Sequence, residues 1–390
     1  MLSLEHRAIV KATVPLLETG GEALTTHFYQ LLLNKHPELR PLFNQAHQAD
    51  GAQPRALANG VLMYAKHIDQ LDALGDLVGR IINKHVSLQI LPEHYPLVGA
   101  CLLQSIEEVL GKEIATAAVI EAWGAAYGQL AEILIGAEEV RYQQNEQAEG
   151  GWRGARAFRL SRKVVESAEI TSLYFEPVDG QAILLAAPGQ YIGLRLSIDG
   201  QEHRRNYSLS ALASHGHYRI SVKREPGGKV SNYLHDRLAI GAPLDLFAPA
   251  GEFTLTDSDK PLVLISGGVG ITATLAMLEA ALPTGRAVHF IHCARNHAAH
   301  GFRTQVDALA MQYPQLKRFY CYEEGAGADA LGRLDASLLE RWLPLSRDVD
   351  AYFLGPKPFM SAVRRLLIAS GVPSQQCRYE FFGPASALDQ

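Results

Sequence analysis

The stretch Pro261-Leu-Val-Leu-Ile-Ser-Gly-Gly-Val-Gly-Ile-Thr-Ala273 joins a run of apolar residues to three glycines and then to a helical pattern. An apolar run that precedes a glycine turn is typical of a buried parallel strand. Gly268 and Gly270 let the backbone approach a pyrophosphate closely, and the N-terminus of the following helix attracts its negative charge. The stretch predicts a dinucleotide site, although a tight strand-to-helix turn in any α/β domain could contain the same glycines.

The patterns on either side of this stretch divide the chain into three regions. From Pro261 onward, apolar strands alternate with helical patterns, which indicates an α/β domain with a parallel sheet. Between Trp152 and residue 260, short alternating runs and turn residues indicate a β-rich domain, which we expect to be a small antiparallel barrel. Helical spacing before it predicts an all-helical domain. We place the domains at 1–138, 152–260 and 261–390, with a polar linker at 139–151.

Composition narrows the class of protein. The chain has 390 residues, of which 47% are hydrophobic and 20% charged, so it is long enough for roughly two to three globular domains. Its net charge of −5, without a block of like charge, argues against nucleic-acid binding. The four cysteines are widely spaced, which argues against a disulfide framework or a metal cluster and fits a reducing compartment. Without a signal peptide or a long apolar segment, we expect a cytoplasmic monomer with no membrane anchor.

Two short elements of the β-rich region have the residue types that bind a flavin. The first is Arg205-Asn206-Tyr207-Ser208, and the second, Gly228-Lys-Val-Ser231, opens a short helical pattern. An arginine can neutralise a diphosphate, an aromatic ring can cover a flavin face, and a serine hydroxyl can hydrogen-bond to a ring nitrogen. Each element alone could be ordinary surface or core, but their order ahead of the glycine turn makes them specific.

These elements resemble the motifs of the ferredoxin reductase-like flavoproteins, together with Pro188-Gly189-Gln190-Tyr191 and the terminal Phe382-Gly383-Pro384. The resemblance implies FAD on the barrel, NADH or NADPH on the α/β domain, and hydride transfer between the stacked rings. The residues that it assigns to FAD are Tyr191, Arg205, Asn206, Tyr207, Ser208, Gly228, Val230, Ser231, Phe381, Phe382, Gly383 and Pro384. Those that it assigns to the nicotinamide nucleotide are Gly268, Val269, Gly270, Ile271, Thr272, Ala273, Gly355 and Pro356.

Three positions depart from the pattern of that family. Ala273 stands where a proline is usual, and Leu354 and Phe381 stand where cysteines are often found. Without a thiol near the hydride path, we expect other contacts to position the nicotinamide. Arg295 and Asn296 follow the second strand of the α/β domain, where an arginine could bind a 2′-phosphate. Family grounds nevertheless favour NADH, with NADPH tolerated.

His85 is the candidate iron ligand of the helical region. It ends an apolar helical stripe that begins at Leu77, so its imidazole should point inward. A lone inward histidine is more often a satisfied core residue than a ligand, and the spacing leaves both interpretations open. Phe43 follows a proline-bounded corner, which would set its ring against a flat cofactor, while Phe28 and Tyr29 lie in the preceding helical segment.

These positions resemble bacterial haemoglobins of the flavohaemoglobin type, and with the reductase region the match covers essentially the whole chain. The resemblance implies a b-type haem, with His85 as the proximal iron ligand and Phe43 packed on the porphyrin. It places Tyr29, Gln53 and Leu57 on the distal, gas-binding side, and Tyr95 and Glu138 on the proximal side. It adds Phe28, Lys84 and Glu380 as residues that line the haem pocket or tune the iron.

The function implied by this resemblance is nitric oxide dioxygenase, which converts nitric oxide and dioxygen to nitrate with electrons passed from NAD(P)H through FAD. Tyr95 would hold Glu138, whose charge would increase electron donation from His85 to iron. Three other interpretations stay open. The protein could be a gas carrier or sensor, a flavin or ferric reductase with a structural helical domain, or a lipid-directed enzyme with an apolar distal pocket at Leu57 and Val61.

Overall fold

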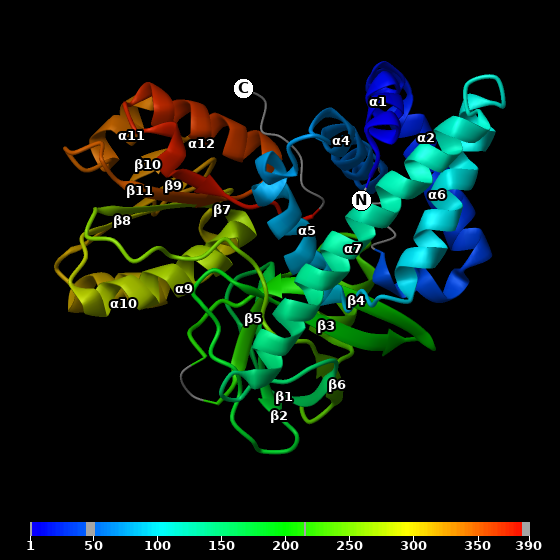
Figure 1. Ribbon diagram of the computed structural model, residues 1–390. Coiled ribbons are helices and arrows are strands. Elements are labelled where there is room, and N and C mark those ends of the chain that lie inside the picture. Colours follow the sequence, from blue (N-terminus) through cyan, green and yellow to red (C-terminus); the bar gives the residue numbers. More distant parts are fainter. Residues whose placement is uncertain (1, 44–50, 214–215, 384–390) are drawn as a thin grey trace. The chain divides into compact units, whose positions relative to one another are not determined.

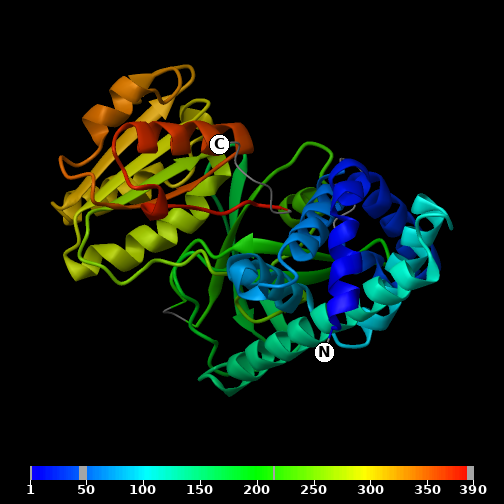
Figure 2. The same ribbon diagram turned by 45° about the horizontal axis from the view of Figure 1, so that its top comes forward.

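The computed structural model describes residues 2–43, 51–213 and 216–383, and the chain divides into two compact units. The first unit is built mainly on the helices that end at Gln147, and the second on two sheets that follow Ala148 (Figures 1 and 2). None of the helices within the described ranges combines the length and the apolar character needed to cross a bilayer.

Helices alone make up the main part of the first unit. They are α1 (Leu4–Ala12), α2 (Val14–Lys35), η1 (Pro37–Leu42), α4 (Ala52–Lys66), η2 (Leu71–Leu74), α5 (Gly75–Leu88), α6 (His94–Leu110) and α7 (Ala117–Gln147). Helix α2 packs against α4 and α6, while α7 packs against α1, α5 and α6. The residues buried between them include Leu24, Leu32, Leu102 and Trp123.

A glycine permits the close packing of α6 and α7. A Cβ atom at Gly99 would lie 2.5 Å from the Cε1 atom of the Tyr127 ring, so a larger residue would displace that ring. Helix α7 also continues as far as Gln147, through much of the segment that we expect to be a linker. Glutamate and glutamine favour helices, and Tyr142 and Asn145 are buried there, which together explain why the polar segment is helical.

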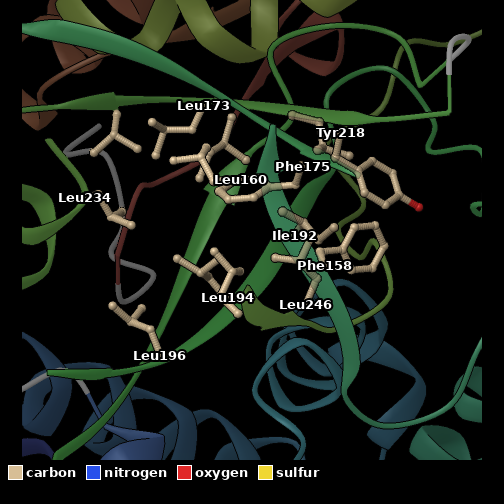
Figure 3. Close-up of a cluster of buried hydrophobic side chains, with 14 of the residues drawn as sticks. Phe158, Leu160, Leu173, Phe175, Ile192, Leu194, Leu196, Tyr218, Leu234 and Leu246 are labelled. Carbon is tan, nitrogen blue, oxygen red and sulfur yellow. The ribbon is translucent and has the colours of Figure 1, made fainter. Parts of the chain in front are cut away.

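The first sheet of the second unit is antiparallel. Its strands are β1 (Arg156–Val165), β2 (Ile170–Pro177), β3 (Tyr191–Ile198), β4 (Gln201–Ser208), β5 (Tyr218–Lys223) and β6 (Pro243–Leu246), in the order β4-β3-β6-β1-β2-β5, and α8 (Lys229–Asp236) follows β5. A bridge between Leu209 and Ile220 joins the two edges of this sheet. Figure 3 shows the enclosed core, to which β1 contributes Phe158 and Leu160 on either side of the exposed Arg159.

The second sheet is parallel. Its strands are β7 (Leu262–Gly267), β8 (Val288–Ala294), β9 (Leu316–Tyr322), β10 (Ala330–Leu331), β11 (Asp350–Leu354) and β12 (Cys377–Tyr379), in the order β10-β9-β8-β7-β11-β12. The helices between them are η3 (Gly268–Gly270), α9 (Ile271–Ala281), η4 (Leu282–Thr284), η5 (His297–Ala299), α10 (Arg303–Gln312), α11 (Ala336–Trp342), α12 (Lys357–Ala369) and η6 (Ser374–Gln376). The chain moves from β7 to β8 on one side and returns to β11 on the other, which makes the carboxyl ends of β7 and β11 a topological switch point.

Helices cover both faces of the parallel sheet (Figure 1). Leu262 and Leu264 pack into the core formed with α9 and α10, whereas Val263 and Ile265 pack into the core formed with α11 and α12. This alternation accounts for the fully apolar β7 segment, since both of its faces are buried. The predicted succession of a helical domain, an antiparallel sheet domain and a parallel α/β domain is confirmed.

Candidate functional site

Three helices of the first unit bring His85, Tyr95 and Glu138 together. The Oε1 atom of Glu138 lies 2.7 Å from His85 Nδ1 and 2.6 Å from the Tyr95 hydroxyl oxygen. The same hydroxyl oxygen lies 3.2 Å from His85 Nδ1. The Glu138 side chain is only 2% exposed, so these polar partners replace water around its carboxylate.

The hydrogen bonds determine the orientation of the His85 imidazole and which of its nitrogens carries the proton. Because a carboxylate only accepts hydrogen bonds, Nδ1 carries the proton and Nε2 offers its lone pair on the other side of the ring. Burial, assisted by the bond to Glu138, raises the pKa of Tyr95, so its hydroxyl stays protonated and donates. An imidazole that is oriented through its second N–H is what an iron ligand requires.

Two tyrosines that the sequence analysis did not single out support this arrangement. The Tyr127 hydroxyl donates to the Tyr95 carbonyl oxygen at 2.6 Å, and the Tyr142 hydroxyl donates to the Ile90 carbonyl oxygen at 2.8 Å. Tyr142 lies one helical turn beyond Glu138, so the spacing of α7 could have revealed it. Both tyrosines anchor the backbone where α5 is followed by α6.

On the other side of the first unit, the predicted distal residues also meet. The rings of Phe28 and Tyr29 lie 5.0 Å apart, and Tyr29 makes an edge contact with Phe43 at 5.5 Å. Burial raises the pKa of Tyr29, and a smaller opposing effect comes from its hydrogen bond with Gln53. The Tyr29 hydroxyl therefore keeps its proton, while Gln53 fixes its direction.

Half-buried apolar side chains connect these two groups of residues. Phe43, Leu57 and Val61 pack on the main helical core together with Val78, and Val78 also packs on the smaller core that contains Tyr95. Lys84, beside His85, is half-buried. Partly exposed apolar groups next to an inward imidazole fit a flat, apolar ring such as haem.

In the antiparallel domain, the predicted flavin residues lie on β3, β4 and α8. Tyr191 and Ser208 are buried, and Tyr207 is half-buried against the barrel core, while Arg205 and Asn206 precede it on the same strand. At the start of α8, Val230 and Ser231 are buried, and a Cβ atom at Gly228 would lie 2.6 Å from Ser231 Oγ. Gly228 provides no side-chain cap, so the N–H groups of α8 suit a diphosphate.

The glycine turn after β7 is built on backbone contacts. Gly268 has φ +55°, and a Cβ atom at Gly270 would lie 2.5 Å from the carbonyl oxygen of Leu354. Val269 is half-buried, and Thr272 Oγ1 donates to its carbonyl oxygen at 3.0 Å. Helix α9 begins at Ile271 without a side-chain cap, so its first N–H groups suit a pyrophosphate.

A second glycine turn, after β11, meets the first. A Cβ atom at Gly355 would lie 2.6 Å from the Phe359 ring and 3.3 Å from the Cα atom of Gly267. Pro356 then precedes α12. The switch point thus brings together both predicted nucleotide turns, as the strand order requires.

The residues that depart from the reductase pattern have different surroundings. Ala273 and Leu354 are fully buried, so neither offers a polar group to a nucleotide. Phe381 is half-buried, with its ring 5.7 Å from that of Tyr379, and Phe382 is 48% exposed. Gly383 ends the described chain, and Pro384 lies outside the described residues. Glu380 follows β12, and its assignment to the haem pocket stays a prediction.

Two acidic residues, Glu323 and Glu324, follow the carboxyl end of β9 beside the end of β8. The backbone N–H of Glu323 donates to the Ala294 carbonyl oxygen at 3.1 Å. The Asn296 amide nitrogen donates to the Glu324 carboxylate at 3.0 Å. Arg295 forms an ion pair with Glu169, a residue of the antiparallel domain. A crossover joins the two strands, so the separation of these residues in sequence hid the cluster.

Family profiles match all three regions of the chain. A globin profile covers residues 26–134, an oxidoreductase FAD-binding domain covers residues 157–255, and an oxidoreductase NAD-binding domain covers residues 264–365. The FAD-binding and NAD-binding matches identify the second unit as an oxidoreductase module with binding sites for those two cofactors. The globin match identifies the first unit as a haem domain.

Two relatives match essentially the whole length of the chain, and a third matches its second unit. The flavohemoprotein of Pseudomonas putida is 72% identical, over 100% of both chains. A flavohemoglobin from Malassezia yamatoensis, solved with bound FAD and heme, is 29% identical with a TM-score of 0.88, over 98% of this chain and 100% of that one. The FAD/NAD-binding domain of a nitric oxide dioxygenase from Vibrio cholerae is 36% identical with a TM-score of 0.56, over 60% of this chain and 100% of that one.

Proposed function

This chain belongs to the flavohemoprotein family, and from that premise we propose that it is a nitric oxide dioxygenase, which converts nitric oxide and dioxygen to nitrate. The observation that carries the proposal is the buried carboxylate of Glu138 at 2.7 Å from His85 Nδ1. A carboxylate in this position makes the imidazole a stronger electron donor, which favours chemistry at oxygen over its reversible storage.

On the proximal side, the protein's contribution is to hold a proton at one atom. Bound haem supplies the iron at which dioxygen is activated. Glu138 retains the proton of His85 on Nδ1, so that Nε2 stays free of a proton and faces the opposite direction. Tyr95 donates to the same carboxylate and keeps it in place.

On the distal side, Tyr29 holds a proton that it can donate to a small polar ligand. Gln53 shares a hydrogen bond with the Tyr29 hydroxyl and fixes its direction, and burial keeps the hydroxyl hydrogen in place at neutral pH. Phe28 and Phe43 contact the Tyr29 ring, and Leu57 packs on the same apolar cluster, so apolar groups limit the access of water to this region. We propose that this hydrogen-bond donor orients dioxygen for its reaction with nitric oxide.

The second unit delivers electrons from a nicotinamide nucleotide. When bound, FAD would supply the chemistry that converts a hydride into single electrons. The turn at Gly268–Gly270 and the start of α9 hold the pyrophosphate of the nucleotide, and the start of α8 with Arg205 holds that of FAD. Tyr191, Tyr207 and Ser208 then position the flavin ring, and Phe381 and Phe382 cover it.

Glu324 favours NADH over NADPH. A carboxylate at the end of β9, beside the end of β8, can accept hydrogen bonds from ribose hydroxyls and repels a 2′-phosphate. Arg295 is the cation that could bind that phosphate, but its charge is engaged by Glu169. We expect NADH to bind more tightly than NADPH, and Glu324→Gln to narrow the difference in Kd about tenfold.

The decisive experiment measures nitric oxide consumption by the purified protein with NADH and oxygen, with nitrate quantified as product. We expect rapid nitrate formation that Tyr29→Phe slows strongly. A slow rate that Tyr29→Phe leaves unchanged would instead indicate a gas carrier whose reductase keeps iron ferrous. A purified protein without a Soret band would indicate a plain flavin reductase.

A fatty acyl chain in the apolar distal region at Leu57 and Val61 is a second ligand that we propose to test. The small apolar cavity that reaches Val61 is lined by Leu16, Leu24, Leu102 and Trp123 and has a volume of about 20 Å³, which is room for about one water molecule, so an acyl chain would require this region to open. Lipid extraction and mass spectrometry of the purified protein test this proposal, since a copurifying acyl chain would support it and its absence would oppose it. Sedimentation of the same sample tests the expected monomer.

A further inference from the structure

Two cysteines outside the proposed catalytic machinery lie directly opposite each other in the parallel sheet. Cys293 of β8 is the register partner of Cys321 of β9. Neighbouring strands lie about 4.8 Å apart, which falls within the range of roughly 4.4–6.8 Å that a disulfide needs between Cα atoms. The backbone therefore already satisfies the first requirement for a bond between the two sulfur atoms.

The two side chains also share one face of the sheet. Cys321 belongs to the core formed with α11 and α12, and Cys293 packs on the edge of that core. The Cys293 thiol donates a hydrogen bond to Cys321 sulfur, and this bond lowers the pKa of Cys321. Cys293 is half-buried whereas Cys321 is buried, so Cys293 is the more accessible residue of the pair.

This pair lies near the carboxyl ends of β8 and β9, in the sheet of the NAD-binding domain. Gly267, the register partner of Cys293 on its other side, immediately precedes the glycine turn. Just beyond the two cysteines, backbone hydrogen bonds join Ala294 to Glu323 and Arg295 to Glu324. A bond between the sulfur atoms would pull on the strand ends that carry Arg295 and Glu324.

We propose that Cys293 and Cys321 form a reversible dithiol site that a hydroperoxide, such as hydrogen peroxide, oxidises to a disulfide. One thiolate attacks a peroxide oxygen, the O–O bond breaks, and the departing hydroxide takes up the thiol proton to give water and a sulfenic acid. The second sulfur attacks the sulfenic sulfur, the S–S bond forms, and the S–O bond breaks to release a second water. Two thiols lose two electrons and two protons in total, and the peroxide accepts them.

The disulfide weakens NADH binding because it shifts the ends of β8 and β9. Because coupling between two sites is reciprocal, bound NADH should in turn disfavour formation of the disulfide. We expect an increase in the Kd for NADH of about fivefold, which lies at the lower end of coupling between linked sites. A thiol reductant should restore the original Kd.

The first test counts thiols in the full-length, cofactor-loaded protein after treatment with hydrogen peroxide. We expect the loss of two thiols, an intact mass lower by two hydrogen atoms, and a crosslinked peptide that contains Cys293 and Cys321. Cys101 and Cys377, also buried, are matched controls: Cys101→Ser and Cys377→Ser should leave the crosslink unchanged, whereas Cys293→Ser and Cys321→Ser should abolish it. The proposal would be overturned if all four thiols remained, if the disulfide joined another pair of cysteines, or if sulfinic acid formed in place of the crosslink.

The second test measures the Kd for NADH by calorimetry before and after peroxide. The double variant Cys293→Ser/Cys321→Ser replaces each thiol with a hydroxyl of similar size that cannot form the bond, so its Kd should not respond to peroxide. An equal loss of affinity in the double variant would contradict the coupling. Both readouts are independent of nitric oxide turnover, so they remain interpretable if the proposed dioxygenase activity fails.

Discussion

The proximal site of the first unit and the glycine turn of the second unit are built in opposite ways. At the proximal site, side chains from three helices converge, and Glu138 is separated from His85 by 53 positions in sequence. At the turn after β7, the glycines come from one short stretch, and the close approach of Gly270 to the Leu354 carbonyl oxygen is a contact between backbone atoms. The first kind of site depends on chemical groups, whereas the second depends on the absence of side chains.

The largest expected effect breaks the side-chain site and spares the other. His85→Ala removes the iron ligand, so haem should be lost and nitric oxide consumption should fall by more than the roughly 100-fold upper limit for supporting partners. The Soret band and nitrate production measure this loss. NADH-dependent reduction of ferricyanide should be unchanged in the same preparation, and a parallel loss of that activity would contradict the separation of the two sites.

The next effect breaks the backbone site. A Cβ atom at Gly270 would lie 2.5 Å from the Leu354 carbonyl oxygen, so Gly270→Ala should cost about 3 kcal/mol of unfolding free energy. At Gly268 nothing lies within 4 Å but φ is +55°, and Gly268→Ala should cost only about 1 kcal/mol. Urea unfolding of both variants checks the ranking. Equal costs would mean that backbone conformation, not close approach, decides the requirement for glycine.

A smaller change tunes the proximal site without removing it. Glu138→Gln keeps the shape of the side chain but removes its charge, so nitric oxide turnover should fall about tenfold while haem stays bound. Tyr95→Phe should have a weaker effect because the bond between His85 and Glu138 remains. The iron–histidine stretching frequency in resonance Raman spectra should fall in the same order, and an unchanged frequency in Glu138→Gln would argue against an electronic role.

The last prediction concerns a buried histidine of the second unit that has no carboxylate partner among the described residues. His292 donates to or accepts from Ser266 Oγ at 2.8 Å, and burial lowers its pKa to about 3. The unfolded chain binds a proton near pH 6.5 and the folded chain does not, so this group's contribution to stability is complete above pH 6.5 and declines as pH falls toward 3. The slope is about 1.4 kcal/mol per pH unit at most.

His292→Asn removes this titration and can keep a hydrogen bond to Ser266. Its unfolding free energy, measured in urea, should depend less steeply on pH between 6.5 and 5 than that of the unchanged chain. His300, whose ring lies 4.4 Å from that of His292, has a pKa lowered in the same direction and should account for part of the remaining slope. Identical slopes would show that His292 does not contribute.

The same contrast explains what could be predicted from the sequence. The glycine turn is local, so the strand, the glycines and the helix start could all be inferred from adjacent residues. The contact between His85, Tyr95 and Glu138 could be predicted only from the family resemblance. Helical spacing indicates which residues share a face of one helix, but it does not show which face of another helix packs there. Glu323 and Glu324 were missed because a crossover through α10 brings them to the end of β8. Polarity of residues 139–147 suggested a linker, but helix propensity and the buried Tyr142 extend α7.

The close packing of Gly99 on Tyr127 has a consequence for the history of this sequence. If a larger residue replaces Gly99 while Tyr127 is present, it displaces the Tyr127 ring, whose hydroxyl donates to the Tyr95 carbonyl oxygen. The opposite order, with Tyr127 replaced first, passes through a form with a void but no collision. The two orders of substitution are therefore not equally tolerated, and during evolution Tyr127 should be replaced before Gly99.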